Sequence, residues 1–401
     1  MTAASLWVVN PSGQRASGEW IDDTLRARAE ERGMLDRTPL AGRFPRQRVE
    51  VVRGDDATEE VNRLFRLRGW TDGLPIVPPT IGRVEEMLSW VPEPQTASLG
   101  ALDPLNGVAT VEKVAANAVM AGCRPEYLPV VLAAVRAIAE PDFNLRGVQT
   151  TDENVAPLLV VSGPVAEAIG MNASFGALGP GWQANATIGR AVRLVMNNIG
   201  GGWPGAVSFA GIAHPGRYTM CLAEAGSQSP WEPLHVELGL KAEDSAIVVT
   251  RAETMINVTG GLPDLASVMG TAASGFAMLH NGIVTVLLAP FVAAELAGQG
   301  LSKADVKRRL WETARMPAEV WRRTWLRERV IESASWPDWV LAGDRDGGIP
   351  PVERPEDISL IVAGGDIPIP QCAYFPSWGF PPCRIAKKIE LPPDWHERLA
   401  R

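Results

Sequence analysis

The alternation of apolar and polar positions predicts a regular succession of helices and strands from about residue 57 onward. Apolar residues recur three or four positions apart over residues 57–68, in two abutting helices within 110–139, and over 186–199, 292–297 and 304–314. Short apolar runs bounded by turn residues predict strands at 157–164 (where the strand runs into a turn), 245–250, 283–288 and 358–363. This alternation predicts an α/β protein of two lobes, built from layered mixed sheets with flanking helices.

Residues that favour helix ends support these boundaries. Thr110 can cap the first of the two abutting helices, Gly122 can end it, and Pro125 opens the second. Ser302 is the expected N-cap of the helix at 304–314, and Asn185 is a potential cap of the helix at 186–199.

The chain is expected to divide into three parts. Residues 1–55 form an N-terminal arm with little sustained periodicity, and residues 56–240 form a main α/β lobe that carries most of the candidate site segments. Residues 241–401 form a second α/β lobe with a C-terminal tail rich in aromatic residues and proline. That tail can serve as a pocket wall or as a contact between subunits, because aromatic residues are enriched at interfaces, and we expect a homo-oligomer.

Composition narrows the function classes. The chain of 401 residues is 46% hydrophobic and 21% charged with a net charge of −8, so we expect no nucleic-acid partner. No apolar run approaches the roughly 20 residues that a bilayer requires, and we expect no membrane span, no secretory signal and a cytoplasmic location. The four cysteines lie far apart in sequence without a CxxC pair and are expected to be thiols.

Asp72 is the first candidate for a site residue. Asp72-Gly73 predicts a turn, and the prolines at positions 75, 78 and 79 keep the following segment extended. We expect this turn to place Asp72 at the site.

Cys123 lies between the two abutting helices, where a helix N-terminus and the adjacent Arg124 favour the thiolate. The thiol is therefore a candidate nucleophile, with a small packed residue in a tight connection as the alternative reading. One helical turn apart upstream, Lys113 and Asn117 share an apolar helix face and line either a pocket or a buried polar network.

A glycine-rich turn precedes Asn185, Thr187 and Arg190. Backbone donors at the start of a helix suit an anion such as a substrate carboxylate or a phosphate, although a capped helix after a loop explains the same pattern. These three residues are candidates for substrate binding.

Two of the four histidines lie in the segment 214–237. His214 and Arg217 are candidates for substrate binding; if the piece from Arg217 is helical, Cys221 and Glu224 share its face. If residues 234–238 form a strand, His235 and Glu237 point the same way and suit general acid–base catalysis, or else form a structural pair. A metal site would need a third ligand, so we assign no metal ligand, and the sequence names no cofactor.

Three segments together resemble a group of bacterial proteins associated with, or fused to, the UGSC-motif selenoprotein-like domain. They are Thr71-Asp72-Gly73-Leu74-Pro75-Ile76-Val77-Pro78-Pro79-Thr80, Asn117-Ala118-Val119-Met120-Ala121-Gly122-Cys123 and Asn185-Ala186-Thr187-Ile188-Gly189-Arg190. The resemblance covers roughly residues 56–401, and the redox-active motif itself is absent from this chain. It implies an enzyme, or an enzyme subunit, of bacterial catabolism or specialised metabolism, with a possible UGSC-type partner chain.

The sequence thus predicts an enzyme that acts on a small carboxylate- or acyl-bearing molecule, by acid–base or thiol-nucleophile chemistry such as C–S, C–C or thioester cleavage. A non-catalytic or half-site subunit of a two-component complex and a metal-dependent hydrolase or lyase are the alternatives.

Overall fold

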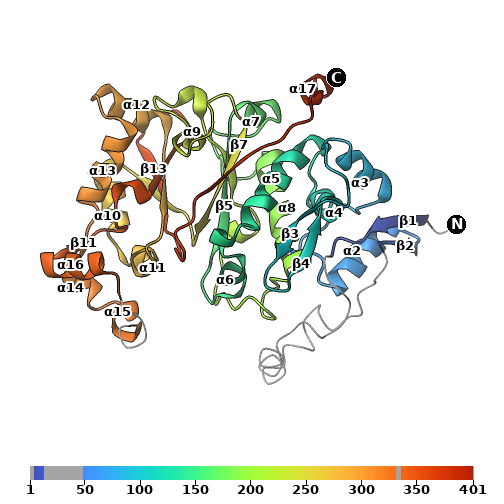
Figure 1. Ribbon diagram of the computed structural model, residues 1–401, viewed down its shortest axis with the longest axis horizontal. Helices are drawn as coiled ribbons and strands as arrows, with labels where there is room; N and C mark the ends of the chain where they lie inside the picture. Colours follow the sequence, from blue (N-terminus) through green and yellow to red (C-terminus); the bar gives the residue numbers. More distant parts are fainter. Residues whose placement is uncertain (1–3, 13–47, 331–335, 401) are drawn as a thin grey trace.

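The computed structural model describes residues 4–12, 48–330 and 336–400, and its body has four layers (Figure 1). Two four-stranded mixed sheets form the inner layers. The first has the order β14-β7-β5-β6, from β5 (Ala156–Ser162), β6 (Cys221–Ala223), β7 (Ala246–Ala252) and β14 (Ile385–Lys388). The second has the order β12-β9-β13-β8, from β8 (Ile256–Thr259), β9 (Val284–Leu288), β12 (Ile358–Val362) and β13 (Gln371–Phe375).

The two sheets pack face to face, which explains why their strands read as continuous apolar runs. In β5, Leu158 and Val160 join Phe375 of the second sheet in one hydrophobic cluster. The alternate residues Leu159 and Val161 join the cluster on the helical side. A strand buried on both faces needs apolar residues at every position, because side chains alternate between the faces.

Helices cover the two outer faces (Figure 1). The first sheet is covered by α5 (Leu128–Ile138) and α8 (Gln183–Val195), on which α4 (Val111–Ala121) packs. The second sheet is covered by α10 (Leu262–Met269), α12 (Pro290–Gly298) and α13 (Lys303–Thr313). The α/β class with layered mixed sheets and flanking helices is therefore confirmed.

Smaller elements complete the described chain. The helices are α2 (Ala57–Leu67), α3 (Ile81–Leu88), α6 (Leu145–Thr150), α7 (Pro164–Ala168), α9 (Leu234–Glu237), α11 (Gly275–His280), α14 (Ala318–Trp321), α15 (Trp325–Val330), α16 (Asp338–Asp346) and α17 (Trp395–Leu399). Antiparallel pairs are formed by β1 (Ala4–Val9) with β2 (Val49–Gly54), β3 (Ser98–Leu102) with β4 (Gly107–Thr110), and β10 (Met316–Pro317) with β11 (Gly348–Ile349).

Most predicted helix ends are confirmed. The Thr110 hydroxyl accepts from the Lys113 amide at the start of α4, and Gly122 ends that helix with a left-handed φ of 88°. Ser302 and Asp305 form a reciprocal capping box at α13. The prediction that Asn185 caps a helix is wrong, because α8 begins at Gln183 with Trp182 as its N-cap.

Strand pairing crosses the predicted lobe boundary near residue 240. β7 lies after that boundary, yet it pairs antiparallel with β5 over its whole length. The C-terminal segment also returns to the first sheet, where β14 pairs with β7. Within the aromatic tail, β13 is an inner strand of the second sheet.

The predicted N-terminal arm is described in part. Its residues 4–9 and 49–54 form the β1–β2 pair, and residues 13–47 lie outside the described residues. In the ranges that the structure covers, no helix has both the length and the apolar composition needed to cross a membrane.

Candidate functional site

A cavity of about 290 Å³ lies beside the end of α8 and is lined by three of the candidate residues, Asp72, His214 and Arg217. Its walls come from the turn at residues 69–72, from the end of α8 with the turn that follows it, and from the loop at residues 202–218. We call it the cationic cavity; its lining residues are Gly69, Thr71, Asp72, Arg193, Asn197, Gly202, Trp203, Pro204, Ser208, Ala210, Ala213, His214, Arg217 and Tyr218.

Two guanidinium groups, those of Arg193 and Arg217, give this cavity its charge. Nε of Arg193 donates to the backbone carbonyl of Arg217 at 2.7 Å, and Nη2 of Arg217 donates to Oγ of Ser208 at 3.0 Å. Arg193 is only 7% exposed, and its Nη2 has no hydrogen-bond partner. Such a buried donor is costly unless a ligand or water satisfies it.

The electrostatic surroundings leave both cations without a dedicated carboxylate. Burial lowers the pKa of Arg193 to about 9, the positive charge of Arg217 lowers it too, and Asp72 raises it. Burial also lowers the pKa of Arg217. Among the described residues that line the cavity, Asp72 is the one carboxylate, and another arginine already holds it. An anionic ligand would therefore be stabilised by both guanidinium groups.

That other arginine is Arg190, which forms a buried two-point ion pair with Asp72. Nε of Arg190 donates to Oδ2 at 2.7 Å and Nη2 donates to Oδ1 at 2.9 Å. The Arg190 guanidinium also bonds to the Pro75 carbonyl at 2.9 Å, so it fastens the extended proline segment to α8. The two predicted site residues thus meet, and their contact fixes the cavity wall.

His214 completes the polar lining from the loop side. Its Nδ1 accepts from the Gly216 amide at 3.1 Å, which leaves the proton of the neutral ring on Nε2. Burial lowers the pKa of His214, the backbone of Asn154 raises it, and Arg217 and Arg193 lower it. The ring is therefore neutral at pH 7.

Local backbone geometry holds this histidine in place. A Cβ at Gly216 would lie 2.7 Å from Cε1 of His214, so only glycine leaves room for the ring. The preceding residue, Ala213, has a φ of 63°, a left-handed conformation that is strained for alanine. Its amide donates to Oδ1 of Asn154 at 2.5 Å. Strain of this kind is concentrated at functional sites.

Asn197 enters the cavity from a turn of π-helix, Met196–Gly200, that follows α8. Such wide turns re-aim side chains and occur frequently at functional sites. Asn197 is 5% exposed, and its Oδ1 has no hydrogen-bond partner. It can therefore accept a hydrogen bond from a hydroxyl or amine of a ligand.

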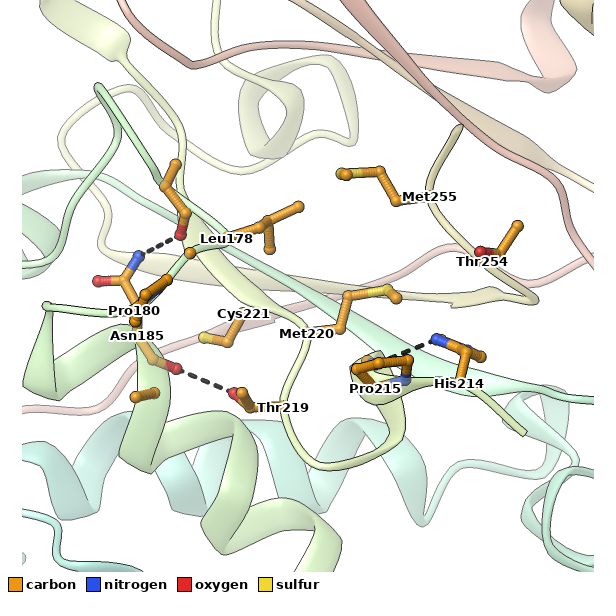
Figure 2. Close-up of a pocket in the computed structure, with 14 residues that line it drawn as sticks. Leu178, Pro180, Asn185, His214, Pro215, Thr219, Met220, Cys221, Thr254 and Met255 are labelled. Atoms are coloured by element: carbon orange, nitrogen blue, oxygen red, sulfur yellow. Dashed lines mark hydrogen bonds between the residues drawn. The ribbon is translucent and has the colours of Figure 1, made fainter. Parts of the chain in front are cut away.

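A second cavity, of about 500 Å³, is lined in part by residues 214–216 and 219–221 (Figure 2). Its lining is mostly apolar and includes Leu178, Met220 and Met255, whose side chains border the open space in Figure 2. His214 lines this apolar cavity as well as the cationic one.

The structure does not give Cys123 the expected thiolate character. Burial raises the pKa of the Cys123 thiol to about 12, although a hydrogen bond with Thr187 and the charge of Arg190 both lower it. Arg124, expected to favour the thiolate, instead pairs with Glu126 at 2.6 Å. The structure favours the reading of Cys123 as a packed small residue.

The prediction that His235 and Glu237 share a strand is wrong, because both lie on the short helix α9. His235 is fully buried, and its Nε2 lies 3.2 Å from the Lys241 carbonyl. Glu237 forms ion pairs with Lys303 and Lys307 of α13. Neither residue lines the cationic or the apolar cavity.

The helix from Arg217, on which Cys221 and Glu224 would share a face, is not formed. Arg217 ends a short 3₁₀ turn, Pro215–Arg217, and Cys221 begins β6. Glu224 accepts from the Ser162 hydroxyl at 2.9 Å and from the Leu234 amide, as a buried structural carboxylate.

The remaining candidates lie outside the cationic cavity. Asn117 is fully buried, donates to the Pro11 carbonyl at 3.0 Å and accepts from Asn198 at 2.7 Å, so it belongs to a buried network. Lys113 bonds to the Val108 carbonyl at 3.2 Å. Asn185 ties residues 172 and 177 to α8 and lines the apolar cavity, whereas the Thr187 hydroxyl donates to the Gln183 carbonyl at 2.8 Å.

The part of the chain that the structure describes contains no cluster of side chains suited to hold a metal ion. No three histidine, cysteine, aspartate or glutamate side chains lie there in an arrangement that could hold a metal ion. The four cysteines are free.

Sequence reasoning missed Arg193, a buried charge of the site. A signal was present, because Arg193 stands alone in the apolar run from Ala191 to Met196. Charged residues are almost never buried unless they are paired, so a lone arginine within an apolar run indicates either a buried partner or a ligand.

Comparison with known proteins gives no information on the function of these cavities. No protein-family model matches the chain, and the searches of curated proteins and of solved structures find no match either. The resemblance to the UGSC-associated proteins therefore stays a prediction.

Proposed function

We propose that the chain is an enzyme that binds a small carboxylate-bearing molecule in the cationic cavity. One observation carries the proposal: Arg193, whose buried Nη2 has no hydrogen-bond partner, lines one cavity together with Arg217 and His214. A carboxylate offers two oxygens to such donors and balances the buried charge.

The neighbouring groups suit acid–base chemistry on the bound molecule. We assign His214 the acid–base role in this proposal, because it lines the cavity and its lowered pKa keeps the ring in the unprotonated form at neutral pH. Asn197 orients a hydroxyl or amine of the substrate through its unpaired Oδ1. The high pKa of Cys123 argues against thiol-nucleophile chemistry, so His214 takes the role first assigned to Cys123 and His235.

The substrate and the reaction are proposed only as classes. Cleavage of a C–S, C–C or thioester bond next to the carboxylate fits a histidine base, and the protein would act in the cytoplasm as a homo-oligomer. A half-site subunit that works with a UGSC-type partner chain is the second candidate, and it rests on the three resembling segments.

Isothermal titration with propanoate at pH 7.5 tests the binding proposal. We expect millimolar affinity that weakens at least about tenfold in Arg193→Met and in Arg217→Met, since hydrogen bonds to charged groups contribute about 1.5–3 kcal/mol. Arg323→Met is the matched control, because Arg323 is exposed and lies outside the cavity.

Circular dichroism must show that each variant is folded. Equal propanoate binding by the wild type and both cavity variants would refute the proposal, as would saturable binding of inorganic phosphate with no binding of propanoate.

A further inference from the structure

We infer that the apolar cavity receives the body of the same ligand whose carboxylate lies in the cationic cavity. The inference rests on the proposed function and names the substrate class: a monocarboxylic acid with an extended acyl or aryl body. A compact hydroxy acid or a dicarboxylate would leave the second cavity empty.

The first argument is that the two cavities adjoin. His214 lines both. Between them lies a gap of about 10 Å³, which shares Arg193, Arg217 and Tyr218 with the cationic cavity. The same gap shares Gly216, Thr219 and Met220 with the apolar cavity. The segment 215–220 is thus a wall common to the two cavities, and the cavities meet at His214, which lines both.

The second argument is the chemistry of the apolar cavity. Among the described residues that line it there is no aspartate, glutamate, lysine or arginine, and its one titratable ring, His214, has a lowered pKa. Leu178, Met220 and Met255 face the open space (Figure 2). Methionine side chains adapt to irregular apolar shapes, so this lining suits a hydrocarbon body better than a second charge.

The third argument is size. A cavity of about 500 Å³ falls within the range of small-molecule sites, which are mostly apolar with a few placed polar groups. The cationic cavity supplies those groups at one end. A ligand that spans both spaces would pass His214 with the atoms that join its carboxylate to its apolar body, which is where the acid–base step is proposed.

A chain-length series tests this inference. We expect the Kd, measured by isothermal titration, to fall from propanoate through hexanoate to octanoate, by about tenfold or more overall, because each buried methylene group adds favourable transfer energy. Met255→Asp places a charge in the apolar cavity at a residue that is 42% exposed, so folding should be retained. We expect it to weaken octanoate binding about tenfold and to leave propanoate binding within about twofold.

The matched control is Ile369→Asp, at an apolar residue that is 50% exposed and lies outside both cavities. It should change neither affinity.

The outcomes separate the two proposals. If propanoate binds through Arg193 but octanoate binds no more tightly, the spanning ligand is refuted and the proposed function stands. If octanoate binds tightly to Arg193→Met as well, the apolar cavity has a ligand of its own, and the inference is again overturned. If neither acid binds, both proposals fail.

Discussion

Two pairs of buried cations, placed on opposite sides of the molecule, differ in what neutralises them. Lys303 and Lys307 of α13 have side chains only 7% and 6% exposed, and Glu237 lies between them with one oxygen for each. Arg193 and Arg217 are close enough for each charge to affect the other, yet no carboxylate of the described chain forms an ion pair with either.

The difference shows how a structural cluster can be told from a site. Burial raises the pKa of Glu237, but the two lysines outweigh it and hold the net pKa below its usual range. That triad is complete without a ligand. The arginine pair borders a cavity and keeps an unused donor, so its charge is available for an anion from outside.

The largest effect should come from removing the shared carboxylate of the lysine pair. Glu237→Gln leaves two buried ammonium groups unpaired, and breaking a buried pair in this way costs about 3–5 kcal/mol. We expect the free energy of unfolding in urea, followed by circular dichroism, to fall by that amount. Glu232→Gln, at an exposed neighbour, is the control and should change it by less than about 0.5 kcal/mol. A loss below about 1 kcal/mol for Glu237→Gln would show that the two lysines do not need this carboxylate in the folded protein.

Glu253 is a buried acid whose negative charge has no cation beside it among the causes that set its pKa. Burial and the negative charge of Glu153 together raise its pKa to about 8, and its Oε1 has no hydrogen-bond partner. A raised carboxyl pKa means that the folded state binds the proton more tightly than the unfolded chain, so stability is present at pH 4 and is lost as pH rises to about 8.

Glu253→Gln should remove this loss. We expect the variant to match the wild type near pH 4 and to exceed its unfolding free energy by on the order of 2 kcal/mol at pH 8.5. Urea titrations at the two pH values measure the difference, with Glu319→Gln as an exposed control. A pH-independent difference would mean that Glu253 is not protonated in the folded protein.

Arg193→Met tests whether the buried guanidinium without a carboxylate partner costs the fold stability. Replacing an uncompensated buried cation by an apolar side chain of similar length should raise the unfolding free energy by about 1–2 kcal/mol, even as propanoate binding is lost. Thermal denaturation without ligand measures the gain. A destabilised variant would show that Arg193 serves the fold, as Lys303 does.

Strands and helices could be predicted from the sequence where burial requires apolar residues at definite positions. Runs such as residues 157–161 are apolar at every position because a second sheet covers the face that water would otherwise reach. The run itself does not say what covers it, so the face-to-face packing of the sheets was not foreseen. The α9 segment was mistaken for a strand because four residues are too few to separate a period of 2 from one of 3.6.

The site was predicted in part. Asp72 and Arg190 were singled out from separate segments and meet across 118 residues, and His214 and Arg217 share one cavity. Cys123 failed because a helix N-terminus and a nearby arginine are visible in sequence, whereas the burial that overrides them is not. The role of Arg193 was missed for the same reason. Only the fold shows that its guanidinium is buried and that its Nη2 has no hydrogen-bond partner.

The smallest effect is the pH dependence of anion binding. Because the pKa of Arg193 is lowered to about 9, its charged fraction falls about tenfold for each pH unit above that value. The wild-type Kd for propanoate should therefore stay constant from pH 7 to about pH 8.5 and weaken toward pH 10 by up to about tenfold. In Arg193→Met the remaining weak binding should change less over this range, because the guanidinium whose pKa is lowered to about 9 has been removed. A wild-type Kd that is flat to pH 10, with folding verified by circular dichroism, would place Arg193 in an ordinary solvated environment and remove the contrast with Lys303 and Lys307.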